Sequence, residues 1–172
     1  LRAAHASMLE DVGIQEIIAA KDQVIARYGP AFQPGRIEEI EEKVLGSFLY
    51  IENNRHWSGL QRQVNRICAD MAKTRNALAS LVNENQSLSS RMQPAAEIKG
   101  MGKGIITAIL HVAYSEKYGV WNNTSDEALA ELEIYPKFAR GASFGDRYEA
   151  INEILKALAD AIQVDLWTLG AL

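Results

Sequence analysis

The segment most suited to chemistry is IKGMGKGIITAIL, residues 98 to 110, where three glycines and two lysines lead into an apolar run. Glycine lets the backbone adopt positive φ and approach a ligand closely. Amides at the start of the following helix would then point outward and attract an anion. Three interpretations follow: the turn binds a nucleotide phosphate, binds a nucleic-acid phosphate, or only begins its own helix.

Both common nucleotide motifs fit this segment poorly. A P-loop requires G-x-x-x-x-G-K-[ST] after a strand, but Gly104 follows Lys103 and Glu97 stands five residues before Gly102. A dinucleotide turn requires G-x-G-x-x-G between a strand and a helix. The glycines here are spaced G-x-G-x-G, and no strand is expected before them. The sequence therefore argues against a nucleotide-binding turn.

A different motif fits better, namely a helix, a short glycine turn and a second, apolar helix. Its pattern of apolar residue, Gly, apolar residue and Gly is matched by Ile98, Gly100, Met101 and Gly102. The segment thereby resembles the helix-hairpin-helix element of DNA-repair proteins, which holds a DNA phosphate without reading bases. The resemblance assigns the following residues to the DNA backbone: Lys99, Gly100, Gly102, Lys103 and Gly104. A glycine-rich turn without a ligand remains the alternative.

The resemblance extends to the helix-hairpin-helix DNA glycosylase superfamily, in which a catalytic Asp lies about 22 residues beyond the first glycine. Counting 22 residues from Gly100 reaches Asn122, and the position of the lysine nucleophile of bifunctional members is Gly104. Glycosidic cleavage needs a negative carboxylate near the reacting centre. An Asn amide supplies none, so the resemblance implies a DNA-binding scaffold without its chemistry. A divergent glycosylase with its chemistry placed elsewhere stays as the second interpretation.

Tyr118, Trp121 and Asn122 form the one candidate base pocket. An extruded base needs a stacking surface and amide-type hydrogen-bonding groups, and these three residues supply both. Core packing is the expected role of Trp57 and Trp167.

A basic stripe is expected on a long helix over residues 55 to 83. At about 100° per residue, its members fall within roughly 20° of one another over about 27 Å. The stripe consists of Arg55, Arg62, Arg66 and Lys73. Apolar residues occupy the opposite side. A solvated helix face is one interpretation, but five cations, counting Arg75, against the single acid Asp70 favour a phosphate-facing surface.

A second resemblance rests on three short sequences: NNRHW at 53–57 followed by Leu60 and Arg62, YGVWN at 118–122, and DLWTL at 165–169. They are similar to a helical module of bacterial and archaeal restriction- and defence-type proteins. The resemblance covers roughly residues 45 to 172. It implies association with DNA and fusion to other DNA-directed domains, and it implies no particular reaction.

Apolar periodicity predicts one all-α domain over residues 1–172, a compact bundle of seven or eight helices with a helix-hairpin-helix element at about 87–114. The expected helices cover 14–28, 36–51, 55–83, 87–96, 103–114, 126–132 and a last long segment from Tyr148 to Ile162. Thr124 or Ser125 is expected to cap the helix that begins at Asp126.

The bulk composition describes a globular chain of 172 residues with 48% hydrophobic residues and a net charge of −4. The single cysteine, Cys68, excludes internal disulfides and four-cysteine metal sites, and it favours the cytoplasm. His5, His56 and His111 lack helical i, i+4 partners, so no metal or cofactor is expected. No apolar run is long enough for a membrane span.

The sequence therefore favours a non-catalytic DNA backbone-binding module of a DNA-processing or defence system. A divergent glycosylase is the enzymatic alternative. A structural module that forms a homodimer through its first helix is the third interpretation.

Overall fold

The computed structural model describes residue 6, residue 8 and residues 10 to 172, and His5 lies outside this part of the chain. The described residues form an all-helical protein, 68% helix, with no strand. None of their helices combines the length and the apolar composition that crossing a bilayer requires. The all-α prediction is confirmed, and nine α-helices of six or more residues replace the expected seven or eight.

The longer helices are α2 (Val12–Ala19), α3 (Lys21–Tyr28), α4 (Glu42–Phe48), α7 (Met71–Val82), α8 (Leu88–Ala96), α9 (Lys103–Ala113), α10 (Asn123–Glu131), α11 (Phe144–Ile162) and α12 (Leu166–Ala171). Shorter pieces join them: α5 (Ile51–Asn54), α6 (Val64–Ile67), and the 3-10 helices η1 (Gly29–Phe32), η2 (Ile37–Glu39), η3 (Leu60–Gln63) and η4 (Cys68–Asp70).

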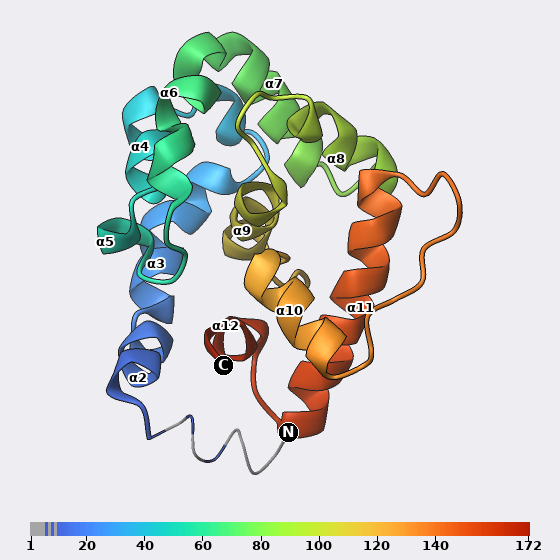
Figure 1. Cartoon of the computed structure of the whole chain (residues 1–172). Coiled ribbons are helices and arrows are strands. Elements are labelled where there is room, and N and C mark those ends of the chain that lie inside the picture. Colours follow the sequence, from blue (N-terminus) through green and yellow to red (C-terminus); the bar gives the residue numbers. More distant parts are fainter. Residues whose placement is uncertain (1–5, 7, 9) are drawn as a thin grey trace.

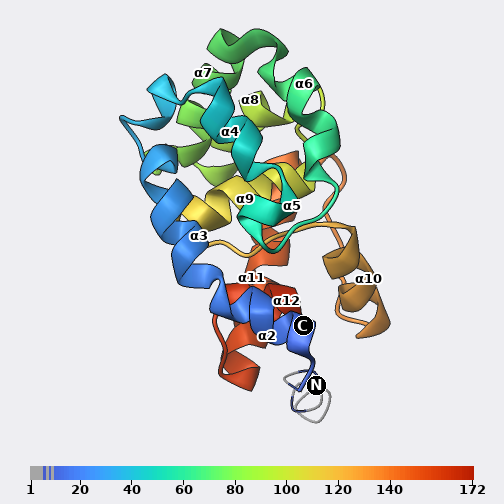
Figure 2. The same ribbon diagram turned by 90° about the vertical axis from the view of Figure 1, so that its left-hand side faces the viewer.

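Helix α9 lies in the middle of the molecule, surrounded by the other helices (Figures 1 and 2). All nine residues from Ile105 to Ala113 are buried. The sequence predicts this, because the segment is apolar nearly all round and no face of it suits water. Its polar side chains bond inside the protein: the Thr107 hydroxyl donates to the Lys103 carbonyl and accepts the Trp121 amide.

Helix α8 packs closely against α11, at the point where α11 begins. Gly145, in the first turn of α11, faces the backbone of Leu88 and Ser89. Ser143 caps α11 in a capping box with Asp146, and its hydroxyl lies 2.6 Å from that of Ser89. The two helix starts are therefore fixed to each other.

The prediction of a single helix over residues 36–51 is wrong. It divides into η2, an extended residue at Ile40 with ψ 129°, α4 and the start of α5. The Ile40 carbonyl, which a continuous helix would use internally, accepts a hydrogen bond from Arg75 Nε at 2.9 Å. The break lets Ile37, Ile40 and Leu45 all enter the core.

The prediction of one long helix over residues 55–83 is also wrong. Within that range, α7 is the only α-helix longer than four residues. Asn54 is fully buried, and its side chain accepts the amides of His56 and Trp57 and donates to the Phe48 and Trp57 carbonyls. This network holds a turn in which Arg55 has φ 61° and Trp57 is buried. The basic residues therefore do not lie on one continuous helix.

Other helix predictions agree with the structure more closely. Helices α8, α9 and α11 begin and end near the expected residues, and the first expected helix is present as α2 and α3, interrupted at Ala20. Helix α10 begins three residues early, because Asn122 rather than Thr124 or Ser125 caps it.

His111 is fully buried beside Trp57 and Trp167, and the burial of both tryptophans confirms the core positions expected of them. Its Nδ1 donates to the Tyr118 carbonyl at 2.6 Å, because a carbonyl can only accept. Nε2 has no partner among the described residues. Burial lowers the pKa of His111 to about 4.

We expect this histidine to make stability depend on pH. Between pH 6.5 and about 4 the unfolded chain binds a proton at His111 and the folded chain does not, so stability falls as pH falls through that window. Compared with His111→Gln, the wild type should lose about 2 kcal/mol more between pH 7 and pH 4.5. Urea titrations at both pH values measure this, and equal losses in both proteins would show that His111 does not titrate there.

Alanine substitutions at two glycines should affect stability differently. Gly145 lies at the contact between α8 and α11, and Gly104 lies in the first turn of α9. An alanine Cβ at Gly145 would lie 2.4 Å from Ser89 Cα, whereas at Gly104 the nearest atom is Asn122 Cβ at 3.5 Å. Overpacking costs about 1–3 kcal/mol, more than the gain in helix propensity of up to about 1 kcal/mol. Gly145→Ala should therefore lower the melting temperature. Gly104→Ala should leave it unchanged or raise it.

Candidate functional site

The glycine turn joins α8 to α9 and is held in place by two buried apolar side chains. Ile98 is 6% exposed and Met101 is 3% exposed, and the Met101 amide donates to the Ile98 carbonyl at 3.0 Å. Gly100 between them has φ +92°, a conformation that side chains with a Cβ rarely adopt. Because Ile98 and Met101 are anchored inward, the residue that follows each of them, Lys99 and Gly102, is left exposed.

The start of α9 presents free backbone donors beside this turn. The amides of Met101, Gly102, Ile105 and Ile106 are all used in the turn or the helix. Those of Lys103 and Gly104 have no acceptor among the described residues. First-turn amides of this kind and the helix dipole together form a partial positive charge.

The turn lies directly against the segment that carries the predicted basic residues. A Cβ built on Gly100 would lie 2.9 Å from Gln63 Oε1 and 3.1 Å from Arg66 Cβ. Arg66 Nη1 donates to Gln63 Oε1 at 3.1 Å, which holds both side chains at the turn. The fold therefore brings together two predicted halves of the site that are more than thirty residues apart in sequence.

A shallow groove runs between these two segments, lined by residues 96–102 together with Gln63 and Arg66. Its cations are Arg66 and Lys99, and its one acid is Glu97. Arg55, Arg62 and Lys73 are exposed, but none of them lines the groove. Of the predicted basic stripe, only Arg66 is thus shown at the turn. We call this feature the groove.

Lys103 is bound to a partner that the sequence did not reveal. Its ammonium forms an ion pair with Asp126 and lies 5.1 Å from the centre of the Trp121 ring. Burial raises the pKa of the Asp126 carboxyl, but hydrogen bonds from Lys103, Trp121 and Tyr135 more than offset this and lower it. Asp126 appeared in the sequence only as a helix-start acid. Lys103 therefore contributes little net positive charge.

The structure does not assemble Tyr118, Trp121 and Asn122 into an open base pocket. Trp121 is 6% exposed, and its ring is nearly parallel to those of Phe144 and Tyr148, with ring centroids 5.5 and 6.4 Å away. The Asn122 side chain accepts the Ser125 amide and caps α10. The third member, Tyr118, bonds to Arg91 and Glu84 instead.

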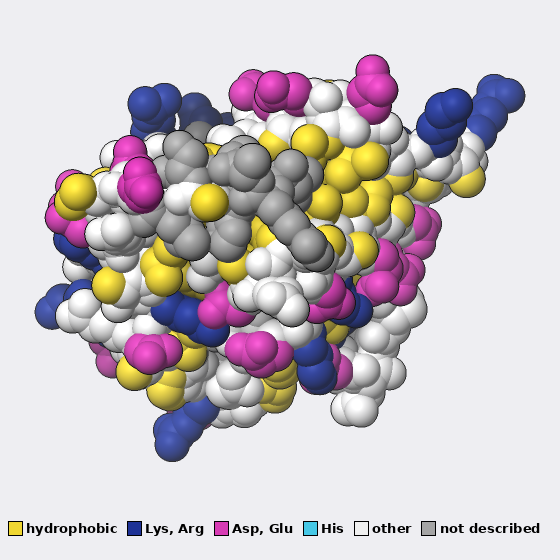
Figure 3. Space-filling view, turned by 90° about the horizontal axis from the view of Figure 1, so that it is seen from below, with side chains coloured by type: hydrophobic (Ala, Val, Ile, Leu, Met, Phe, Trp, Pro, Cys, Tyr) yellow, Lys and Arg dark blue, Asp and Glu magenta, His cyan; other side chains and the backbone are white. Residues whose placement is uncertain are grey.

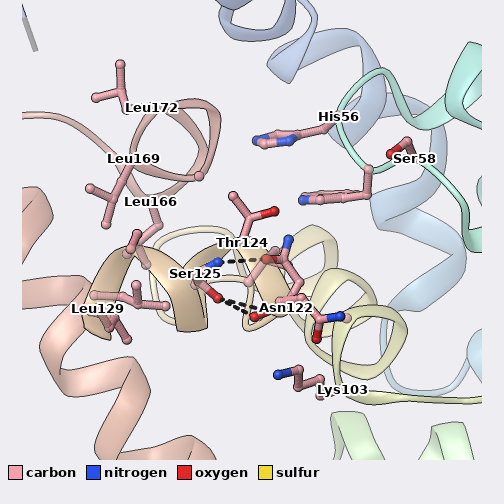
Figure 4. A pocket seen from close by; sticks show the side chains of 18 of the residues that line it. His56, Ser58, Lys103, Asn122, Thr124, Ser125, Leu129, Leu166, Leu169 and Leu172 are labelled. Carbon is pink, nitrogen blue, oxygen red and sulfur yellow. Dashed lines mark hydrogen bonds between the residues drawn. The ribbon is translucent and has the colours of Figure 1, made fainter. Parts of the chain in front are cut away.

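A deep cavity of about 700 Å³ lies on the other side of the glycine turn, and the sequence did not predict it. Leucines of α10 and α12 form one side, and His56, Ser58, Asn122 and Lys103 lie across from them (Figure 4). Hydrophobic side chains also gather on the face seen from below (Figure 3). The available signal is the spacing of leucines three apart on each of the last three helices: 129 and 132, 155 and 158, and 166, 169 and 172.

No protein-family model matches this sequence, and neither a curated protein nor a solved structure is significantly similar to it. Within the described part of the chain, no three His, Cys, Asp or Glu side chains cluster in a way that could hold a metal ion. The helical resemblances therefore stay predictions, and function has to be inferred from the site itself.

A cap substitution tests the structural role of Asn122. Asn122→Ala should destabilise the protein by about 1 kcal/mol, because the Ser125 amide loses its acceptor. Asn122→Ser keeps an acceptor and should cost much less. Denaturant unfolding of both variants measures the difference, and equal stability of Asn122→Ala and wild type would contradict the capping role.

Proposed function

We propose that the chain is a non-catalytic module that binds the nucleic-acid backbone, DNA in the first instance, with the α8–turn–α9 unit working as a helix-hairpin-helix. The observation that supports it is the contact between Gly100 and Arg66. One phosphate at the turn would meet a guanidinium, the Lys99 ammonium and the free amides that begin α9. Such contacts position a backbone and carry no base readout.

The local charge supports binding at this surface despite the net charge of −4. The groove holds two exposed cations against one carboxylate. Arg62 is exposed on η3, the same short helix as Gln63, and would extend the contact along a strand. A phosphate chain needs a local positive strip rather than a basic protein.

The proposed module lacks the features of a glycosylase. Asn122 uses its side-chain oxygen in a helix cap, and the Trp121 side chain is buried in the core. The resemblance to restriction- and defence-type modules supports a setting in a DNA-processing or defence protein, where other domains would supply the chemistry.

A salt series tests the proposal. Duplex and single-stranded oligonucleotides should bind with an affinity that falls roughly 10- to 150-fold between 50 and 200 mM salt, as expected for two to four phosphate contacts. Arg66→Ala should lower the salt slope by about 1. Lys137→Ala, an exposed cation in the loop between α10 and α11, is the matched control and should bind like wild type.

A second pair of variants isolates the backbone donor. Lys103→Ala removes the ammonium, and Lys103→Pro removes the ammonium and the unpaired amide together. Proline suits this first helical position because Gly102 before it is extended, with ψ 175°. Weaker binding by Lys103→Pro than by Lys103→Ala supports the amide contact. Negligible affinity of the wild type for every oligonucleotide at 50 mM salt would refute nucleic-acid binding.

A further inference from the structure

The deep cavity has an aliphatic wall that the protein itself leaves partly uncovered. The wall is formed by Leu129, Leu132, Leu155, Leu158, Leu166 and Leu169. Leu132 is 41% exposed, while Leu158 and Leu169 are only half-buried. The volume of about 700 Å³ falls within the usual range of small-molecule sites. A wall of leucines from three helices favours an alkyl chain.

The opposite side of the cavity offers hydrogen-bond donors that lack acceptors. Trp57 lines it and is only 6% exposed, and its indole N–H has no acceptor among the described residues. The Trp57 nitrogen is not one of the buried side-chain atoms without a partner, so it reaches the open space of the cavity, where a ligand atom can accept its hydrogen bond. The free amides of Lys103 and Gly104 lie on the same cavity. Two independent sets of donors therefore meet the same space.

The charges of the residues that line the cavity indicate which charge a ligand should carry. The described lining residues include Lys103 and no Asp or Glu, in a chain that carries 22 acidic residues. Lys103 is paired with Asp126, which leaves the helix start as the remaining positive feature. An anionic head group fits this end of the cavity.

A nucleobase fits the cavity less well than an alkyl chain. His56 already stacks on the Trp57 ring at 4.7 Å, and Phe48 and Trp167 meet that ring edge-on. Leucine is the most frequent residue type in the lining, which suits an alkyl chain better than a planar base.

We propose that the cavity binds a single-chain anionic amphiphile, a straight alkyl chain with a carboxylate or phosphate head. The head accepts hydrogen bonds from the first-turn amides of α9 and from Trp57 Nε1. The chain lies along the leucines of α10, α11 and α12. This site goes beyond the proposed nucleic-acid function, because neither Arg66 nor Lys99 lines the cavity. The two proposals share the free amides of α9, so Lys103→Pro bears on both, whereas Arg66→Ala and Ala128→Trp separate them.

Calorimetric titration of the full chain with monomeric dodecanoate tests the proposal. Binding should be one to one, and affinity should rise about fourfold per CH₂ from octanoate to dodecanoate, as burial of methylene groups predicts. Dodecyl phosphate distinguishes the two kinds of head, and binding of either supports an anionic site. Dodecanol and dodecyltrimethylammonium should bind at least tenfold more weakly. Equal binding of dodecanol would overturn the assignment of the head.

Matched variants locate the site. Ala128 lines the cavity, whereas Ala130 on the same helix does not, and both are exposed. Ala128→Trp should weaken dodecanoate binding at least tenfold, and Ala130→Trp should leave it unchanged. Trp57→Phe keeps an aromatic ring but removes the pyrrole ring with its N–H, and should weaken binding several-fold. Arg66→Ala should reduce DNA binding alone, so failure of one proposal is distinguishable from failure of the other. No detectable dodecanoate binding, or equal binding by Ala128→Trp and wild type, would overturn the proposed site.

Discussion

The burial of α9 from Ile105 to Ala113 is the constraint on which the rest of the structure depends. Nine consecutive buried residues leave no solvent face, so polar side-chain atoms there can find partners only within the protein, as the Thr107 hydroxyl and His111 Nδ1 do. Its backbone can meet a ligand only at an end. At the C-terminal end the Tyr114 amide donates to the Leu110 carbonyl, and the Tyr114 hydroxyl donates to Val82. At the N-terminal end two amides remain free, beside the glycine turn. A ligand that contacts the backbone amides of α9 is thereby restricted to that turn.

The sequence correctly predicted the helices in which the buried side chains follow the helical spacing of apolar residues. Helices α8, α9 and α11 have uninterrupted apolar stripes and clear caps or breakers at their ends, so local patterns were enough. The segments 36–51 and 55–83 also show helical spacing, yet tertiary contacts overrule it. The Arg75 guanidinium donates a hydrogen bond to the Ile40 carbonyl, and hydrogen bonds of the buried Asn54 side chain hold the turn before Trp57. Such long-range hydrogen bonds have no local signature.

The candidate site was predicted in part, for the same reason. The glycine turn was visible because its residue types and spacing are local. Placing Arg66 beside Gly100 depended on how η3 and α6 pack, and the straight helix assumed for residues 55–83 gave the wrong geometry for Arg55 and Lys73. The ion pair of Lys103 with Asp126 spans 23 residues, and the residues that line the cavity extend from Met8 to Leu172. Neither is accessible to a local pattern.

The glycine turn separates two hollows, and this arrangement has a thermodynamic consequence. Gln63, Gly100 and Gly102 line both the shallow groove and the deep cavity, so the same few atoms form part of both walls. A molecule that stiffens or shifts this shared wall from one side changes the free energy of occupying the other. Any such coupling must be reciprocal, with each occupant altering the affinity for the other by the same factor. The residues that both sites share would thus couple the two binding equilibria.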